Sequence, residues 1–333
     1  MPTLSVALCT YNGARFIREQ IRSIALQTLP PQEIVLSDDA SRDDCVAVAR
    51  TALQECLAQR PGLVLPLRVL QNTAPLRVTK NFEQAVRECT GDLIALSDQD
   101  DVWPPQRLAR MAACFAQRGD LTLLHTDARL VDRQGAPLGG SLFHALEVTR
   151  SERERIHAGA AFEVFLRRNL VTGAATVFRR SLLAAALPFP AEWVHDEWLG
   201  IIAAAVGRVD MLEEPLLDYR QHGGNQIGAQ RDSLMGKVRK ALASRGTTHI
   251  ERADKAQQLL ERLERLERLG PDQIAAGLLE KVRVKLDHQR FRAALPASRW
   301  ARCVPVLREA MTGRYDQFGR GFRGVVRDLF ESV

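Results

Sequence analysis

A short apolar run that ends on three carboxylates decides the fold of this chain: residues 93–101 have the sequence LIALSDQDD. Leu93–Ser97 carries almost no polar side chain, as expected for a strand that is buried on both faces. Asp98 and Asp100 lie two residues apart on extended chain, so their side chains project from the same side. Two such carboxylates suit a hard divalent cation, whereas Asp101 equally suits the N-cap of a following helix.

Three similar runs precede this strand, and helical patterns separate them. The predicted strands are Leu4–Cys9, Glu33–Ser37 and Leu67–Leu70, and the predicted helices include Asp43–Gln59 and Thr79–Cys89. Strands that alternate with helices predict an α/β fold with an open, mostly parallel sheet flanked by helices. In such sheets ligands bind beyond the carboxyl ends of the strands, which is where Asp98 lies.

Polar side chains also follow the first two strands. Thr10, Tyr11 and Asn12 come directly after the first strand, and Asp38 and Asp39 come at the end of the second. A carboxylate at this edge can accept a hydrogen bond from a pyrimidine N–H or a ribose hydroxyl, although an Asp pair also suits a turn and an N-cap. Three adjoining strand ends with polar side chains predict a ligand site. The chain has no P-loop motif, which disfavours P-loop NTPases.

The second half of the chain is less regular and then becomes helical. Further predicted elements are a helix from Pro104 to Gln117, strands at Leu121–Leu124, Ala174–Phe178 and Pro215–Tyr219, and helices at Arg180–Ala186 and Glu197–Val206. From about residue 231 the pattern is helical, with leucines on one face of residues 257–269. We therefore predict a main domain over residues 1–230 and a basic helical C-terminal extension over residues 231–333.

Charge and cysteine content bear on partners and location. The net charge of +6 is uneven, because residues 231–333 contain 22 Lys and Arg against 13 Asp and Glu. A basic appendage is attracted to anionic surfaces, although solvated helices are often basic for solubility alone. The six cysteines show no disulfide or metal-site spacing, and neither a secretion signal nor an apolar run of bilayer-spanning length is present. We therefore expect a cytoplasmic protein.

Three ordered segments resemble the motifs of family 2 glycosyltransferases. They are residues 6–13, VALCTYNG, residues 34–41, IVLSDDAS, and residues 91–103, GDLIALSDQDDVW. The resemblance covers roughly residues 3–228 and implies the GT-A fold, a Rossmann-like fold of nucleotide-diphospho-sugar transferases. It also implies a catalytic domain whose first half, about residues 1–102, binds the nucleotide-sugar and whose second half, about residues 103–230, binds the acceptor.

The resemblance assigns roles to the polar strand ends. The residues that it implies for nucleoside binding are Thr10, Tyr11, Asn12, Asp38 and Asp39. Asp98 and Asp100 match positions that serve the ribose, the diphosphate and a metal ion, Mg²⁺ or Mn²⁺. Lys80 matches a segment that lies near the nucleotide, with an exposed lysine at a helix start as the alternative.

A second acidic cluster, WVHDEW at residues 193–198, supplies a candidate base. Transfer to a hydroxyl requires a group that takes its proton, and a carboxylate held beside the donor can do so. Asp196 aligns with the family's catalytic base, in an H-D-x-W form that resembles rhamnosyltransferase-like members. Glu197 is the fallback base, and a helix cap is the alternative role for Asp196. His195 is expected to pack or to position its neighbours.

Two later segments complete the predicted site. Thr172–Ala174 resembles the family's acceptor-side loop, in which a glycine lets the backbone approach a sugar closely. The run YRQHGGN at residues 219–225 resembles a segment of the same subgroup. Arg220 or His222 is predicted to neutralise the departing diphosphate, and His222 is also predicted to complete the metal shell. A loop histidine bonded to backbone is the alternative for His222.

The sequence thus predicts an inverting, metal-dependent glycosyltransferase. The expected donor is a dTDP- or UDP-sugar, with L-rhamnose from dTDP-rhamnose favoured, and the expected acceptor is a saccharide or lipid-linked saccharide of the bacterial cell envelope. Arginines and aromatic residues between Gly313 and Phe330 suit an interfacial helix at the inner face of the membrane, or a packed helical cap. No nucleic-acid partner is expected. The alternatives are a sugar nucleotidyltransferase and a non-catalytic binding scaffold.

Overall fold

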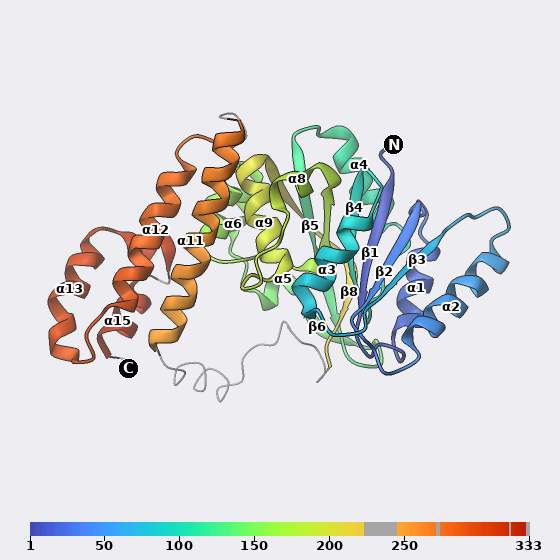
Figure 1. Cartoon of the computed structure of the whole chain (residues 1–333), viewed down its shortest axis with the longest axis horizontal. Helices are drawn as coiled ribbons and strands as arrows, with labels where there is room; N and C mark the ends of the chain where they lie inside the picture. The colour runs from blue at the N-terminus through green and yellow to red at the C-terminus, as the bar shows by residue number, and fades with distance from the viewer. Residues whose placement is uncertain (223–244, 271–273, 320, 331–333) are drawn as a thin grey trace. The chain divides into compact units, whose positions relative to one another are not determined.

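The computed structural model describes residues 1–222, 245–270, 274–319 and 321–330 (Figure 1). The chain divides into two compact units. The first comprises Met1–Ala161 and Leu170–Gln230, and the second comprises Phe162–Asn169 and Arg231–Val333. Residues 223–225 of the YRQHGGN run and residues 231–244 of the predicted extension lie outside the described residues.

One mixed sheet of eight strands runs through the first unit. The strands are β1 (Leu4–Thr10), β2 (Glu33–Asp38), β3 (Leu67–Gln71), β4 (Leu93–Asp98), β5 (Leu121–Val131), β6 (Pro137–Ser141), β7 (Thr176–Arg179) and β8 (Arg208–Arg220). Their order is β3-β2-β1-β4-β7-β5-β6, and β8 pairs with β5. The first four strands are parallel, β7 is antiparallel to β4 and β5, and β8 is parallel to β5. The predicted α/β sheet is confirmed.

Helices cover this sheet (Figure 1). They are α1 (Ile17–Ala25), α2 (Cys45–Gln59), α3 (Arg77–Glu88), α4 (Arg107–Gln117), α5 (Leu142–Ala145), α6 (Arg150–His157), α8 (Leu183–Ala186) and α9 (His195–Val206), with 3₁₀ turns η1 (Gly173–Ala175) and η2 (Arg180–Leu182). Helix α1 shows why they form where they do. Its isoleucines Ile17, Ile21 and Ile24 recur at helical spacing and are fully buried in the core.

The strand order reverses at β1, and this reversal brings the polar strand ends together. The chain places β2 and β3 on one side of β1 and then returns to place β4 on the other side. In the resulting register Thr10 lies opposite Asp38, and Cys9 lies opposite Asp98. Open α/β sheets bind their ligands at such a reversal.

The sequence prediction underestimates two strands in the second half of the first unit. β5 continues to Val131 instead of ending at Leu124, and β8 begins at Arg208 instead of Pro215. The two strands pair with each other through several register shifts, and the middle of β8 is exposed. Pairing between distant segments keeps them extended, so a local apolar pattern does not reveal them.

The second unit consists of helices. They are α7 (Ala161–Arg167), α11 (Arg245–Leu269), α12 (Leu278–Ala293), α13 (Arg299–Met311), α14 (Arg314–Phe318) and α15 (Phe322–Phe330). Most of the predicted leucine face of α11 is buried, since Leu259, Leu263 and Leu266 are at most 3% exposed, whereas Leu269 at the end of the helix is 66% exposed. An ion pair between Lys281 and Glu163 joins α12 to α7. Among the helices of the described residues, none is both long and apolar enough to span a bilayer.

We predict that Arg107→Leu destabilises the first unit by about 3 kcal/mol, because it leaves two buried carbonyl oxygens without donors. The Arg107 side chain is fully buried and donates to the carbonyl oxygens of Leu216, at 3.0 Å, and Ala174, at 2.7 Å. Urea unfolding followed by tryptophan fluorescence measures the loss. On the same helix, Arg110 makes an exposed ion pair with Glu214, so Arg110→Leu is the control and should change stability by less than about 1 kcal/mol. Equal effects of the two changes would contradict the prediction.

Candidate functional site

The carboxylates of Asp98, Asp100 and Asp196 lie close together at the carboxyl end of β4. Asp98 is the last residue of the strand, and Asp100 follows it in the next turn; both are half-buried. Desolvation, followed by repulsion from Asp100 and then from Asp196, raises the pKa of Asp98 to about 7. Asp196, which the sequence nominates as the base, therefore shares one site with the acidic segment, residues 98–101, although Asp100 and Asp196 are 96 positions apart in the chain.

Asp196 is held in the first turn of α9 by two backbone donors. The N–H of Gly173 donates to its Oδ2 at 2.9 Å, and the N–H of Glu197 donates to its Oδ1 at 2.6 Å. Desolvation nevertheless raises the pKa of Asp196 to about 6. The helix starts at His195 with Val194 in the N-cap position, so the alternative in which Asp196 is the N-cap is wrong. A half-buried carboxyl with this pKa is suited to accept a proton near neutral pH.

His195 has a packing role, as the sequence predicts, and its ring is uncharged beside Asp196. Its ring stacks on Phe82 with centroids 3.9 Å apart, and burial lowers its pKa to about 3, so the ring is neutral. A Cβ atom on Gly173 would lie 2.5 Å from His195 Nε2. Gly173 is therefore required because its backbone fits between His195 and Asp196, which is a different reason from the close approach of a sugar that the sequence suggests.

The turn after β1 is fastened to the acidic segment. Gln99 accepts the N–H of Tyr11 at 2.8 Å and donates to the carbonyl oxygen of Tyr11 at 3.1 Å. Asn12 adopts a left-handed backbone with φ of 50°, and its N–H donates to Ser41 Oγ. The side chain of Tyr11 is 43% exposed, whereas Thr10 is buried and donates to Asp38. Of these three predicted nucleoside ligands, Tyr11 and Asn12 lie at the surface of the site.

The two carboxylates that end β2 are occupied by the protein. Asp38 is fully buried and accepts the hydroxyls of Thr10, at 2.9 Å, and Ser41, at 2.5 Å. Asp39 accepts the N–H groups of Leu76, at 2.5 Å, and Arg77, at 2.9 Å, just before and at the start of α3. These bonds match the turn alternative for Asp38, and nucleoside binding by either residue stays a prediction.

Lys80 faces the segment that leads to α9. Its Nζ donates to Glu83 Oε2 at 2.7 Å and to the carbonyl oxygen of Phe189 at 2.6 Å. One residue earlier, the hydroxyl of Thr79 donates to the carbonyl oxygen of Trp193 at 2.7 Å. The start of α3 thus holds the loop before Asp196, and a direct contact of Lys80 with a nucleotide stays a prediction.

Arg220 and His222 hold the acidic segment from the other side. The buried Arg220 guanidinium donates to the carbonyl oxygen of Asp100 at 2.7 Å and to Glu19 Oε2 at 2.6 Å. His222 lies 2.7 Å from Asp100 Oδ2 through Nε2 and stacks on Phe16 with centroids 4.9 Å apart. His222 is thereby placed beside a carboxylate of the site, and a metal-binding role for it stays a prediction.

Asp101 does not cap the helix after Pro104. Helix α4 begins at Arg107, with Gln106 in the N-cap position, and Asp101 Oδ1 instead accepts the N–H of Arg220 at 3.1 Å. Asp101 is 1% exposed, so its role is to join the acidic segment to the end of β8. The N-cap prediction for Asp101 is therefore wrong.

The donor set fits a divalent cation only in part. Across residues 1–222 and the other described ranges, no three His, Cys, Asp or Glu side chains are arranged to hold a metal, so Asp98, Asp100 and His222 do not form a ready triad. Mg²⁺ at nucleotide sites commonly takes one or two carboxylates together with phosphate oxygens and water. Asp98 and Asp100 have this chemistry, and a cation between them would relieve the repulsion that raises the pKa of Asp98.

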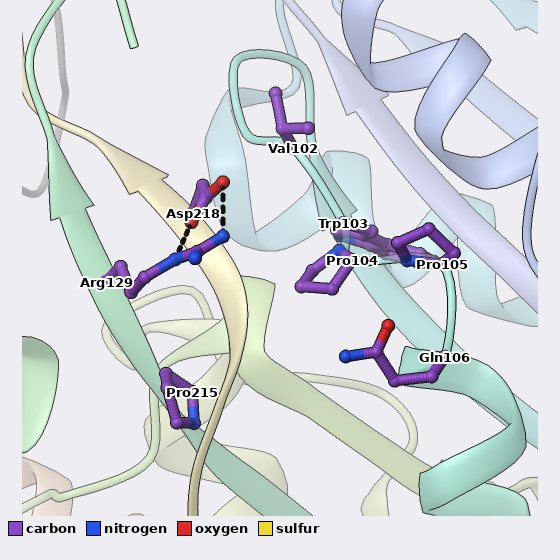
Figure 2. A pocket seen from close by; sticks show the side chains of 8 residues that line it. All are labelled: Val102, Trp103, Pro104, Pro105, Gln106, Arg129, Pro215 and Asp218. Carbon is purple, nitrogen blue, oxygen red and sulfur yellow. Dashed lines mark hydrogen bonds and ion pairs between the residues drawn. The ribbon is translucent and has the colours of Figure 1, made fainter. Parts of the chain in front are cut away.

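A pocket of about 380 Å³ opens directly after the acidic segment (Figure 2). Its lining residues are Val102, Trp103, Pro104, Pro105, Gln106, Arg129, Pro215 and Asp218. Figure 2 shows Arg129 and Asp218 paired across two neighbouring strands at its wall, with Arg129 Nε 2.5 Å from Asp218 Oδ1. None of the site residues predicted from the sequence lines this pocket.

The sequence prediction missed Gln99 and Glu19. Gln99 clamps the turn after β1, and a Cβ on Gly13 would lie only 2.1 Å from Gln99 Oε1. Glu19 is the carboxylate partner of Arg220. Gly13 is a local signal for the first contact, whereas the second has no local signal because its partners are 201 positions apart in the chain.

Parallel strands whose order reverses at β1, with carboxylates gathered at that reversal, are typical of nucleotide-binding α/β proteins. The model of the family described as Glycosyl transferase family 2 matches residues 5–185, which is more than half of the chain. The chain therefore belongs to glycosyl transferase family 2.

Curated relatives agree with this assignment. An uncharacterized glycosyltransferase of Nostoc sp. is 27% identical over 228 residues, which cover 67% of this chain and 66% of the relative. The putative glycosyltransferase EpsE of Bacillus subtilis is 28% identical over 134 residues, covering 40% of this chain and 46% of EpsE. The chain thus matches less than two thirds of the length of these relatives.

The solved structure of residues 1–349 of S. aureus TarS in complex with UDP-GlcNAc is similar in fold. The TM-score is 0.53 at 20% identity, and the match covers 95% of this chain and 89% of the TarS chain. The predicted GT-A fold with C-terminal helices is confirmed.

We predict that the Asp196 carboxyl titrates with a midpoint near pH 6, because burial disfavours its charged form. Carbon-13 NMR of labelled aspartate, assigned by the resonance that Asp196→Asn removes, measures the midpoint. A midpoint near the ordinary Asp value of about 4 would contradict the described environment.

Proposed function

We propose that this protein is an inverting glycosyltransferase that transfers a sugar from a nucleoside diphosphate donor to a hydroxyl of a saccharide or lipid-linked saccharide. The observation that carries the proposal is the position of Asp196, a carboxyl with a raised pKa, beside Asp98 and Asp100 at the reversal of the sheet. A base and a cation-binding acidic segment in one site are what such a transfer requires.

In the proposed reaction, Asp196 takes the proton of the acceptor hydroxyl while that oxygen attacks the anomeric carbon. The bond from this carbon to the diphosphate oxygen breaks, and the nucleoside diphosphate leaves. Attack from the face opposite the leaving group inverts the anomeric configuration. The N–H groups of Gly173 and Glu197 keep the carboxylate of Asp196 oriented for this step.

We propose that Asp98 and Asp100 hold Mg²⁺ or Mn²⁺ together with the diphosphate. The cation would offset the negative charge that develops on the leaving group. Arg220 lies against the carbonyl oxygen of Asp100 and places a positive charge close to the acidic segment. His222, at 2.7 Å from Asp100 Oδ2, either orients that carboxylate or joins the metal shell.

For the donor we propose a dTDP- or UDP-sugar, with dTDP-L-rhamnose as the first candidate. The support is the HDEW run at residues 195–198 and the YRQH run at residues 219–222, which resemble the rhamnosyltransferase-like subgroup. Tyr11 is exposed beside the acidic segment and offers a ring face to the base of the nucleotide.

We propose a cytoplasmic role in cell-envelope polysaccharide synthesis. The six free cysteines fit a reducing compartment. A lipid-linked acceptor presents its saccharide at the inner face of the cytoplasmic membrane, so peripheral contact with that surface, through the basic C-terminal region, would bring enzyme and acceptor together.

The donor and the metal are tested together by thermal unfolding with a panel of nucleotide-sugars, each with and without Mn²⁺. A donor at about one hundred times its Kd should raise the Tm by roughly 5–10 °C, since ligand stabilisation follows affinity for the folded state. Asp98→Asn or Asp100→Asn should abolish the part of the Tm increase that depends on Mn²⁺. Asp120→Asn is the control, because Asp120 is 60% exposed and precedes β5 at the opposite edge of the sheet. A shift that persists in full with chelator would remove the metal from the proposal.

We predict that Asp196→Asn keeps the donor-induced Tm shift and lowers sugar transfer about a thousandfold or more, because the amide cannot accept the proton. In the native protein, transfer should be constant above pH 6 and fall about tenfold per unit at lower pH, as Asp196 becomes protonated. Product formation by chromatography measures both. Wild-type rates in Asp196→Asn would exclude Asp196 as the base and direct attention to Glu197. If a nucleotide-sugar raises the Tm but no sugar is transferred, the result would favour a non-catalytic binding protein.

A further inference from the structure

Four large apolar side chains form a row along one side of α13. Trp300, Val304, Leu307 and Met311 follow one another at spacings of four, three and four residues, which places them on one face of the helix. Their exposed fractions are 89%, 56%, 55% and 81%. These side chains are therefore presented to the surroundings and are not part of the core.

Helix α15 presents a second row of the same kind. Phe322, Val326 and Phe330 recur at intervals of four residues and are 78%, 37% and 64% exposed. α13 and α15 pack against each other in the second unit (Figure 1). Large apolar patches on a folded protein mark sites of interaction. We call these two rows the apolar rim.

The opposite faces of both helices are already packed. Val306 of α13 and Val325 of α15 form a small core with Tyr315 of α14. Arg302, on the inner face of α13, is fully buried and donates to the carbonyl oxygen of Ala297 at 2.8 Å. The second unit therefore does not need the apolar rim for its own packing.

The acidic residues of the two helices lie inside. Glu309, the carboxylate of α13, is 8% exposed and lies 2.7 Å from His288 Nδ1. Asp328, the carboxylate of α15, is fully buried and accepts two bonds from Arg292, at 2.6 and 2.8 Å, and one from the Tyr315 hydroxyl at 2.7 Å. Neither helix exposes a negative charge.

The exposed charged residues of α13 and α15 themselves are arginines, whereas Asp316 of the neighbouring α14 is an exposed acid. Arg299 and Arg308 on α13 and Arg323 on α15 are exposed, and Arg327 is half-exposed. Aromatic and aliphatic side chains bordered by arginines, with the acids turned inward, are the arrangement of helices that lie in the interface of an anionic bilayer. A second copy of the chain would bring two arginine borders together, which like-charge repulsion disfavours.

We propose that the apolar rim is a membrane-docking surface that inserts into the headgroup region of a bilayer containing anionic lipid. The rows of α13 and α15 enter the boundary of the acyl chains, and the bordering arginines contact the lipid phosphates. This surface assigns residues to the peripheral membrane contact proposed above, and it does not depend on the transferase activity, because binding to lipid requires no nucleotide-sugar.

The position of the tryptophans makes the proposal directly measurable. Trp300 is 89% exposed, whereas Trp103, Trp193 and Trp198 are at most 5% exposed. Any change of tryptophan emission on binding vesicles therefore reports on Trp300. The full chain is mixed with phosphatidylcholine vesicles that contain phosphatidylglycerol, and with vesicles of phosphatidylcholine alone. The expected result is a blue shift and quenching by brominated acyl chains with the anionic vesicles, reduced by high salt.

Matched variants separate docking from folding. Leu307→Ser with Phe322→Ser should lower the partition coefficient in vesicle sedimentation at least about tenfold. Val64→Ser with Leu138→Ser is the control, because these residues of the first unit are 83% and 54% exposed and should not affect partition. Trp300→Phe should keep sedimentation and lose the emission change. Unchanged Tm values confirm that the variants fold.

Three outcomes would overturn the proposal. The first is the absence of a blue shift and of sedimentation with anionic vesicles. The second is equal binding to both vesicle types, which removes the role of the arginines. The third is a dimer in light scattering that Leu307→Ser with Phe322→Ser dissociates while vesicle binding stays unchanged, which would assign the apolar rim to a second copy. A protein that docks on lipid but transfers no sugar would leave this inference intact and defeat only the proposed activity.

Discussion

The pairing of β1 with β2 on one side and β4 on the other is the constraint on which the site depends. Because these strands are parallel, their carboxyl ends meet at one edge, and the register places Thr10 beside Asp38 and Cys9 beside Asp98. The segments that follow can then bond to one another across the edge, as Gln99 does with Tyr11. Without this order of strands, the acidic segment would be an ordinary turn.

Some polar residues at this edge are bonded within the protein and shape the site, whereas others remain available to bind a ligand or to react. Asp38, Asp39, Asp101 and Arg220 are bonded to backbone or buried partners, so they fix the geometry. Repulsion acts instead on Asp98, whose pKa it helps to raise because Asp100 and Asp196 are close. Such like-charge crowding is unfavourable in the free protein and is relieved by a cation or a proton, which is typical of functional sites.

The second unit follows a different physical rule. On α13 and α15 the acids are buried and paired, as Asp328 is with Arg292, while arginines and large apolar side chains face outward. Pairing satisfies the buried charge, and the exposed rows of α13 and α15 are available for contact with other molecules. We therefore propose two different kinds of surface for one chain: a polar donor site at the sheet edge of the first unit, and an apolar docking surface bordered by arginines in the second unit.

The sequence by itself determined the family, the first four strands and the candidate carboxylates, because buried parallel strands are continuous apolar runs and their polar ends are adjacent in sequence. Only the tertiary structure shows the full length of β5 and β8, because these strands pair with each other over a long distance in the chain. The same is true of Gln99, which bonds to Tyr11, and of Glu19, which pairs with Arg220. The same holds for the reason Gly173 is needed and for what Asp101 does. Local pattern shows that a residue is polar and where its strand ends; only the packed chain decides which partner satisfies that residue and which residue remains available for a ligand.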